Sequence, residues 1–328
     1  MKLQEPINMI KYVNVLLSNS AVSFCHYQYK IPDKIEWMAP ETLNKIVSFC
    51  SNRNLSLNFI YHKIKTSIPY ELNSLIEQIP HTSIIPYGLD INAEAVVIEG
   101  KDFKDLKKTT DFSEKAIILL ISKSDISQLP KMFEYFCKNC LKLSVILLDI
   151  PKYSKEDIFI YKKALEQSEF GLLNIYKKAR TSLPEINIIT DLWFSNTMHN
   201  CNAGIDHITF GPNGKLYICP AFYQNDNNDE ISDDIKIKNK QLLELEFAPI
   251  CRECDAYHCL RCVYLNKILT NEINTPSWQQ CQLAHIEREF SRKLLMHLKK
   301  ENPLFLQIRD ISPVYYSDPL EKIIKKRK

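Results

Sequence analysis

The alternation of short β-rich runs with helix-like segments is the feature that most constrains the fold. Val-, Ile- and aromatic-rich runs predict strands at residues 12–17, 55–61, 83–87, 95–99, 116–122, 143–150 and 186–190. Pro40 and Glu41 open one expected helix, and residues 124–138 and 155–178 are expected to form two more. This order predicts an α/β fold with a largely parallel sheet, arranged as an open or partial β/α barrel. The run 143–150 is almost entirely apolar, which is typical of a strand covered on both faces.

Composition narrows the class of protein. The chain has 328 residues, which favours two domains, and its 45% hydrophobic and 25% charged residues are ordinary for a globular protein. A net charge of +3 argues against a nucleic-acid-binding protein. The N-terminus has no secretory pattern, and the longest apolar runs are too short to span a membrane. We therefore expect a cytoplasmic protein that does not bind a membrane.

Cysteines are concentrated in one stretch. Seven of the eleven lie at Cys201, Cys219, Cys251, Cys254, Cys259, Cys262 and Cys281. In a reducing compartment, such a cluster indicates metal ligands rather than disulfides. The turn Gly211–Gly214 predicts a hairpin of strands 206–210 and 215–218, which would bring Cys201 and Cys219 to one end. Seven thiols exceed one tetrahedral site, so two sites are expected, and both zinc and iron–sulfur clusters remain open as occupants.

This cysteine order resembles the SPASM domain, the auxiliary-cluster domain of many radical-SAM peptide-modifying enzymes. Cys201, Gly214 and Cys219 match its first part, and the four-cysteine block and the lone Cys281 follow in the family order, with the block more tightly spaced. The resemblance implies two [4Fe-4S] clusters. Cys251, Cys254, Cys259 and Cys281 would hold one of them. Cys201, Cys219 and Cys262 would hold the other, whose fourth ligand is open to His199 or His207.

The N-terminal region resembles a radical-SAM barrel that has lost its cofactor loops. Of the three cluster cysteines expected after the first strand, only Cys25 is present, because Ala21 and Gln28 stand at the other two positions. One thiolate cannot hold a cluster that needs three. The glycine-rich loop expected after the second strand is replaced by a sequence that begins at His62 and contains no glycine. The resemblance therefore implies a protein that neither binds nor cleaves SAM.

A degenerate barrel joined to a SPASM-like block is similar to the peptide maturases of "grasp-with-spasm" cassettes, and a close rival is the maturase of Cys-repeat peptides. The resemblance implies an accessory role in making a ribosomally synthesised, modified peptide. Its partners would be an ATP-grasp ligase and the leader of a precursor peptide. No catalytic acid, base or nucleophile is identified. The alternatives are a zinc-stabilised protein-interaction module, an active radical-SAM enzyme and a nucleic-acid-binding zinc protein.

The expected domains are a degenerate radical-SAM-like β/α domain at residues 1–192 and a SPASM-like cluster-binding domain at 193–290. A helical extension with a basic tail is expected at 291–328. Three polar segments are expected to be exposed: a surface helix or loop at 101–115, a mobile loop at 224–234 and a disordered tail at 321–328.

Overall fold

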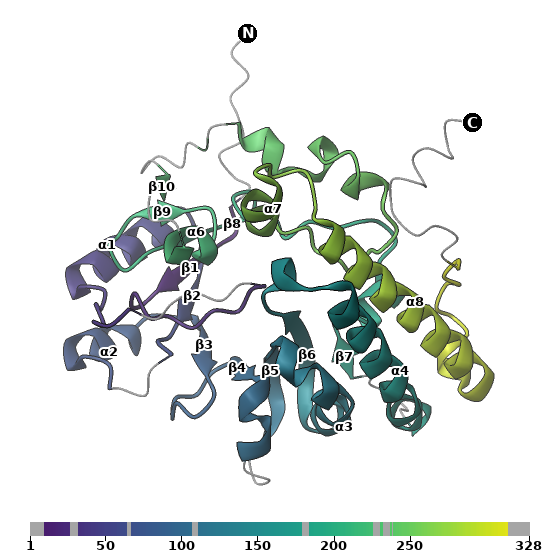
Figure 1. The fold of residues 1–328 in the computed structure, drawn as a ribbon. Coiled ribbons are helices and arrows are strands. Elements are labelled where there is room, and N and C mark those ends of the chain that lie inside the picture. Colours follow the sequence, from purple (N-terminus) through teal and green to yellow (C-terminus); the bar gives the residue numbers. More distant parts are fainter. Residues whose placement is uncertain are drawn as a thin grey trace. The chain divides into compact units, whose positions relative to one another are not determined.

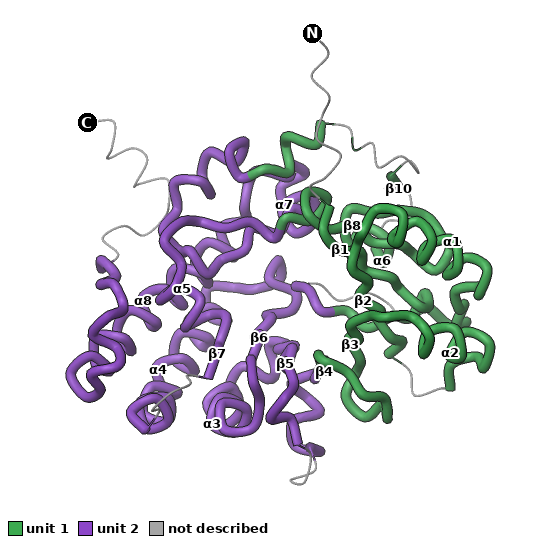
Figure 2. The backbone as a smooth tube through the Cα atoms, turned by 180° about the vertical axis from the view of Figure 1, so that it is seen from behind, with its two compact units in different colours: residues 1–23, 28–97, 202–244 green, residues 24–27, 98–201, 245–328 purple. Residues whose placement is uncertain are grey.

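The computed structural model describes residues 10–26, 32–63, 67–106, 111–178, 184–225, 230–231, 237 and 239–313. These residues form an α/β fold with a mostly parallel sheet, as the strand–helix alternation predicts (Figure 1). The chain divides into two compact units: residues 1–23, 28–97 and 202–244 form unit 1, and residues 24–27, 98–201 and 245–328 form unit 2 (Figure 2). Each unit takes in residues from both sides of the expected domain boundary at 192/193.

The described strands of unit 1 follow the order β10-β9-β8-β1-β2-β3-β4, and the last two residues of β4 are counted in unit 2. The strands are β1 Tyr12–Leu16, β2 Ser56–Ile60, β3 Thr82–Pro86, β4 Ala95–Glu99, β8 His207–Phe210, β9 Leu216–Tyr217 and β10 Glu230–Ile231. β1 lies in the middle, parallel to both β2 and β8, and its last four residues are fully or almost fully buried. The helices of this unit are α1 Pro40–Ser51, α2 Tyr70–Ile76 and α6 Pro220–Asn225.

The predicted hairpin is confirmed. β8 and β9 pair antiparallel, and the turn between them closes with Gly214 N–H donating to the Gly211 carbonyl at 2.9 Å. Gly214 has a φ of +77°, a backbone conformation that L side chains rarely adopt. A turn that needs this φ therefore ends with glycine.

The described residues of unit 2 include the parallel strands β5 Phe112–Ile121, β6 Cys140–Leu147 and β7 Glu185–Ile186. Its helices are α3 Leu129–Asn139, α4 Lys155–Lys178, α5 Thr190–Phe194, α7 Val263–Thr270 and α8 Trp278–Glu301. It also contains the 3-10 helices η1 Gly100–Asp105, η2 Lys123–Gln128, η3 Ile150–Lys152, η5 Leu245–Phe247, η6 Cys251–Glu253 and η7 Pro303–Phe305, whereas η4 Lys240–Leu243 belongs to unit 1. No helix in the described ranges combines the length and the apolar character needed to cross a membrane.

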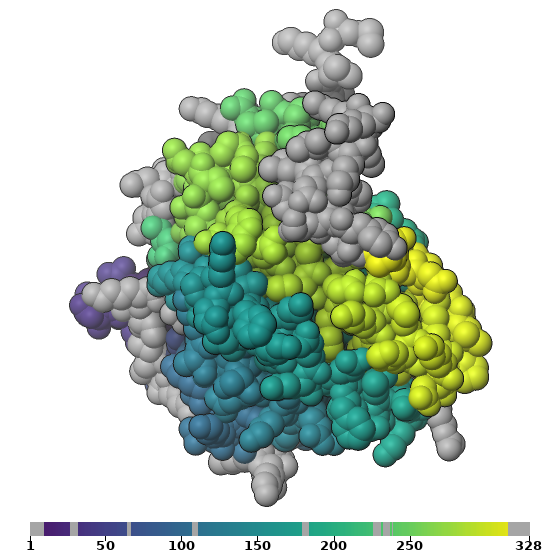
Figure 3. Space-filling model, turned by 45° about the vertical axis from the view of Figure 1, so that its right-hand side comes forward, coloured from purple at the N-terminus to yellow at the C-terminus, as the bar shows by residue number. Residues whose placement is uncertain are grey.

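Helix α8 connects the parts of unit 2. It packs along α4, and Figure 3 shows the teal residues of the α4 region and the yellow-green residues of the α8 region side by side on one face. Ser291 of α8 donates its hydroxyl to the Ile189 carbonyl at 2.8 Å, and Arg288 donates to the Asp255 carboxylate at 3.1 Å. One helix therefore holds both the turn before α5 and the loop of residues 251–262, which we call the cysteine-rich loop.

Four local predictions are wrong in part. The predicted strand 186–190 stops at Ile186, because the Thr190 hydroxyl bonds both the N–H and the C=O of Ile186 and turns the chain into α5. The predicted helix 124–138 begins as the 3-10 helix η2, and α3 starts only at Leu129, with Pro130 in its first turn. The predicted surface segment 101–115 ends within β5, where Phe112 is buried while the next two residues are exposed.

The fourth concerns the expected loop 224–234, because Glu230 and Ile231 form β10 and pair with β9. Helix α8 also crosses the expected boundary at 290/291 without a break. Gln28, most of the rest of the loop 224–234 and the basic tail 321–328 lie outside the described residues.

Candidate metal-binding site

A loop of tight turns in unit 2 carries three of the seven cysteines. Cys254 N–H donates to the Cys251 carbonyl at 3.0 Å, and Cys259 N–H donates to the Ala256 carbonyl at 2.8 Å. The Ala256 N–H points at the Cys254 sulfur at 3.4 Å. These turns fold Cys251, Cys254 and Cys259 back toward one another, with a backbone donor already directed at one sulfur.

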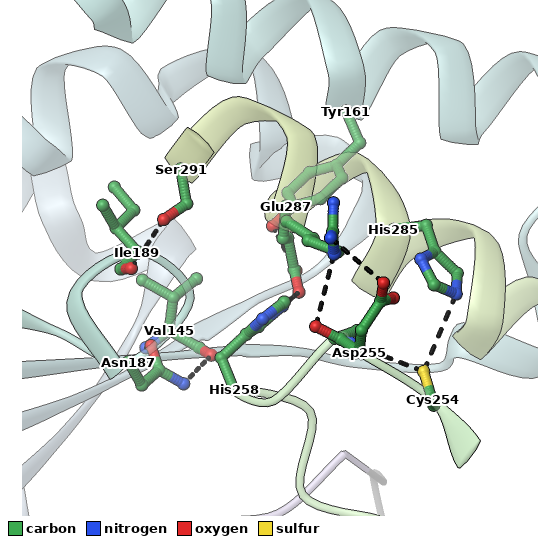
Figure 4. Close-up of polar contacts among 12 residues, drawn as sticks. Val145, Tyr161, Asn187, Ile189, Cys254, Asp255, His258, His285, Glu287 and Ser291 are labelled. Atoms are coloured by element: carbon green, nitrogen blue, oxygen red, sulfur yellow. Dashed lines mark hydrogen bonds and ion pairs between the residues drawn. The ribbon is translucent and has the colours of Figure 1, made fainter. Parts of the chain in front are cut away.

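Helix α8 supplies the fourth thiol. Ser277 caps the helix by accepting from the Gln280 N–H at 3.2 Å, which places Cys281 in the first turn. One turn further along, the ring nitrogen Nε2 of His285 lies 3.8 Å from the Cys254 sulfur. Figure 4 shows His285 and Glu287 extending from α8 toward the loop that carries Cys254 and His258.

The four thiols share one electrostatic environment. Burial raises the pKa of Cys259 well above its ordinary value, and the negative charges of Cys254, Cys251 and Cys281 raise that pKa further. Burial and the neighbouring Cys254 also raise the pKa of Cys251 to about 11. The structure therefore groups Cys251, Cys254, Cys259 and Cys281, which is the set that the resemblance implied for one cluster. None of these four cysteines forms a disulfide.

Cys201 and Cys262 form a second group in unit 2. A parallel bridge between Asn200 and Arg261, the residues next to them, holds their two segments together. Burial and the charge of Cys201 raise the pKa of Cys262 to about 12, while the Leu265 N–H, which donates to the Cys262 sulfur at 3.5 Å, lowers it. Cys262 thereby acts as the N-cap of α7.

The remaining predicted ligands are Cys219 and His207 in unit 1 and His199 in unit 2. Cys219 belongs to unit 1, where it is buried just before α6. His207 is also in unit 1; its ring stacks on Tyr12 at 4.9 Å, and burial lowers its pKa. His199 lines a pocket of unit 2 that also contains Asp191.

Within the described part of the chain, no three Cys, His, Asp or Glu side chains are close enough together to hold one metal ion. The four thiols of the first group therefore interact electrostatically, but they are not at the mutual distances of metal ligands. Their chemistry still fits a metal or an iron–sulfur cluster, because four thiolates are the donor set of both structural zinc and [4Fe-4S] clusters.

The loop after β1 is where the resemblance to radical-SAM enzymes would place a SAM-binding cluster. In this chain the loop packs against other residues. Ala21 is fully buried, forms a bridge with His62, and its carbonyl accepts from Gln224 at 2.9 Å. Cys25 is half-buried and forms no disulfide. These side chains and backbone bonds make the loop part of the packing.

Two residues of the site are missing from the sequence-based prediction. His285 could have been found from the spacing Cys281-x-x-x-His285, which puts both side chains on one face of a helix. Arg261 carries no such signal. The residue is 1% exposed; burial lowers its pKa, and the charges of Cys251, Cys201 and Cys262 raise it. A buried cation therefore lies within reach of both thiol groups.

Comparison with known proteins adds no family. No protein-family model matches the chain, and no curated protein matches it significantly.

Proposed function

We propose that the chain is a cytoplasmic, cluster-binding accessory maturase of a ribosomally synthesised peptide, with a degenerate radical-SAM-like domain and a SPASM-like domain. The observation that supports this most directly is the grouping of Cys251, Cys254, Cys259 and Cys281 around one another. The resemblance to the SPASM domain implies the same set of four cysteines for one cluster.

In this proposal those four cysteines hold one cluster, and Cys201 and Cys262 contribute to the second. Such a cluster supplies electron transfer or an iron atom that a substrate can approach. The chain's own part is to exclude water around Cys251, 7% exposed, to donate the Ala256 N–H to the Cys254 sulfur, and to place the Arg261 cation near both groups. Hydrogen bonds and charges of this kind orient thiolate ligands and tune their affinity.

The metal is tested by anaerobic purification and reconstitution, followed by iron, sulfide and zinc analysis and by absorption spectra. Wild-type protein should contain iron and sulfide. Cys259→Ala should lose most of the metal, since binding and folding of such a site are coupled. Cys50→Ala is the matched control, because Cys50 is a buried thiol of α1 in the other unit and should leave the metal content unchanged. Cys201→Ala should have a milder effect than Cys259→Ala.

The maturase role is tested by co-expressing a precursor peptide and an ATP-grasp ligase with and without this chain. The product mass should change only when the chain is present, and a pull-down should recover precursor or ligase. The isolated protein incubated with SAM and reductant should form no 5′-deoxyadenosine. An unchanged product, together with no binding to either partner, would contradict the proposal.

A zinc-stabilised interaction module is the second candidate, and one observation favours it. His285 Nε2 lies 3.8 Å from the Cys254 sulfur, and mixed thiolate and imidazole ligands are typical of zinc. Stoichiometric zinc without iron, even after anaerobic reconstitution, would select this candidate. His285→Ala should then weaken zinc binding by about tenfold or more, as loss of a ligand or of its hydrogen bond does.

A further inference from the structure

Helices α4 and α8 of unit 2 line a groove that the proposed maturase function does not use. The two helices run side by side, as Figure 1 shows. The groove between them has a volume of about 520 Å³, and Leu165 and Phe290, which are 1% and 6% exposed, contribute apolar surface to its lining. Along α8 it extends from Gln282 to Lys293, a distance of about 16 Å. The groove is therefore long enough for about three turns of another helix.

Large apolar side chains on both helices are exposed beside this groove. On α4, Phe159 and Phe170 are 50% and 77% exposed, and on α8, Trp278 and Met296 are both 44% exposed. Steps of three or four residues connect the two members of each pair through residues that line the groove, which places them on the same side of their helix. Exposed apolar surface on two adjacent helices is typical of a protein-interaction site.

The charged groups of the groove have an excess of cations. Each of its three carboxylates is paired at 2.7 Å: Glu166 with Lys163, Glu169 with His297 and Glu289 with Arg292. Lys162 of α4 and Lys293 of α8 also line the groove, are exposed and form no ion pair among the described residues. The hydrogen bond from Lys163 lowers the pKa of Glu166, and the charges of these two groove lysines lower it further. Two ammonium groups, one from each helix, are therefore available to an anionic partner.

We propose that this groove docks an acidic amphipathic helix of a partner peptide. The apolar side chains of that helix lie against Leu165, Phe290 and the exposed rings beside the groove, and its carboxylates pair with Lys162 and Lys293. A second copy of the same face would bring like charges together, and the basic residues 321–328 of this chain would add more positive charge. The proposal depends on the surface of unit 2 and does not rest on a bound metal or on the maturase role.

The test uses full-length protein and fluorescein-labelled peptides of about 18 residues, or five helical turns, with binding followed by fluorescence anisotropy. The first peptide has leucines along one side of a helix and glutamates beside them. The second has lysine in place of every glutamate, and the third has the acidic composition in an order that gives no apolar side. The first peptide should bind about tenfold or more tightly than either of the others, and added salt should weaken its binding.

Reversal of both groove lysines gives the sharper test. Lys162→Glu/Lys293→Glu should bind the acidic peptide about tenfold or more weakly than wild type does, and should instead prefer the lysine peptide. Both lysines are exposed, so the variant should fold, and circular dichroism checks this. Lys104→Glu/Lys131→Glu is the matched control, because it changes the net charge equally at exposed lysines of η1 and α3, away from the groove lining. This control should bind like wild type.

Phe170→Ser tests the apolar contribution separately. Since this ring is 77% exposed, its loss should leave the fold intact and weaken binding of the acidic peptide by about threefold or more. Equal or tighter binding of the lysine peptide by wild type, or unchanged binding of the acidic peptide by the double groove variant, would overturn the proposal. A wild-type dimer that Phe170→Ser dissociates would also overturn it, because a second copy would then occupy the groove.

Discussion

Replacing Arg261 with methionine tests whether a buried cation holds the cysteine-rich segment in place. Arg261 donates from Nε to the Asn200 side chain at 3.0 Å and from Nη1 to the Asn274 side chain and, at 3.5 Å, to the Ile273 carbonyl. Methionine keeps much of the apolar stem but leaves all three acceptors without these donors. Each hydrogen bond from a charged donor contributes about 1.5–3 kcal/mol to stability. Part of this loss is offset, because the methionine variant no longer has the desolvation cost of a buried cation. The free energy of unfolding should therefore fall by about 3–5 kcal/mol.

The assay is equilibrium urea unfolding of the full-length chain, with wild type and variants prepared identically, followed by tryptophan fluorescence, since Trp193 and Trp278 both lie in unit 2. Arg252→Met is the matched control; the Arg252 side chain is 51% exposed, so its loss should change stability by no more than about 0.5 kcal/mol. Arg261→Lys should fall between the two, because an ammonium keeps the charge but not the planar fork. Equal stability of the two methionine variants would refute the structural role of Arg261.

Two more predictions concern α4. The pKa of Asp157 is lowered to about 2 by hydrogen bonds from Lys123 and then Ser154, so its stabilisation is present above its ordinary pKa of 3.8 and lost as the pH falls through about 2. Asp157→Asn should therefore lower the urea midpoint at pH 6, and its difference from wild type should vanish toward pH 2; a constant difference would contradict this. A Cβ at Gly171 would meet nothing within 4 Å, so Gly171→Ala should stabilise the helix by about 0.5–1 kcal/mol, whereas Gly214→Ala should destabilise the hairpin. Thermal melts that show no difference between these two variants would contradict the argument.

Elements with a strong local pattern were predictable from the sequence. The predicted bounds of β4 and α4 agree with the structure at both ends, because apolar runs and helical periodicity reflect burial directly. The predicted bounds were wrong where a single contact sets the direction of the backbone, as when the Thr190 hydroxyl bonds back to Ile186 and ends the strand. They were also wrong for the first residues of β5, whose polar side chains at Ser113 and Glu114 are exposed and look like a surface loop.

The same division applies to the candidate site. Close cysteine pairs indicated a metal site from the sequence, whereas the set Cys251, Cys254, Cys259 and Cys281 was implied only by the resemblance to the SPASM domain. Residues that come together only in the tertiary structure carried no such signal in the sequence. The buried Nδ1 of His258, which has no hydrogen-bond partner among the described residues, can be recognised only from the folded chain.

The central place of β1 in the sheet of unit 1 has a consequence for synthesis on the ribosome. β1 leaves the ribosome well before one of its two neighbours, β8, which ends at Phe210. Until that residue has left the exit tunnel, one edge of a strand with four buried residues stays open to other chains. In the nascent chain, β1 must therefore wait for β8 before both of its edges are paired. A fragment that ends at residue 192 would keep that edge open permanently.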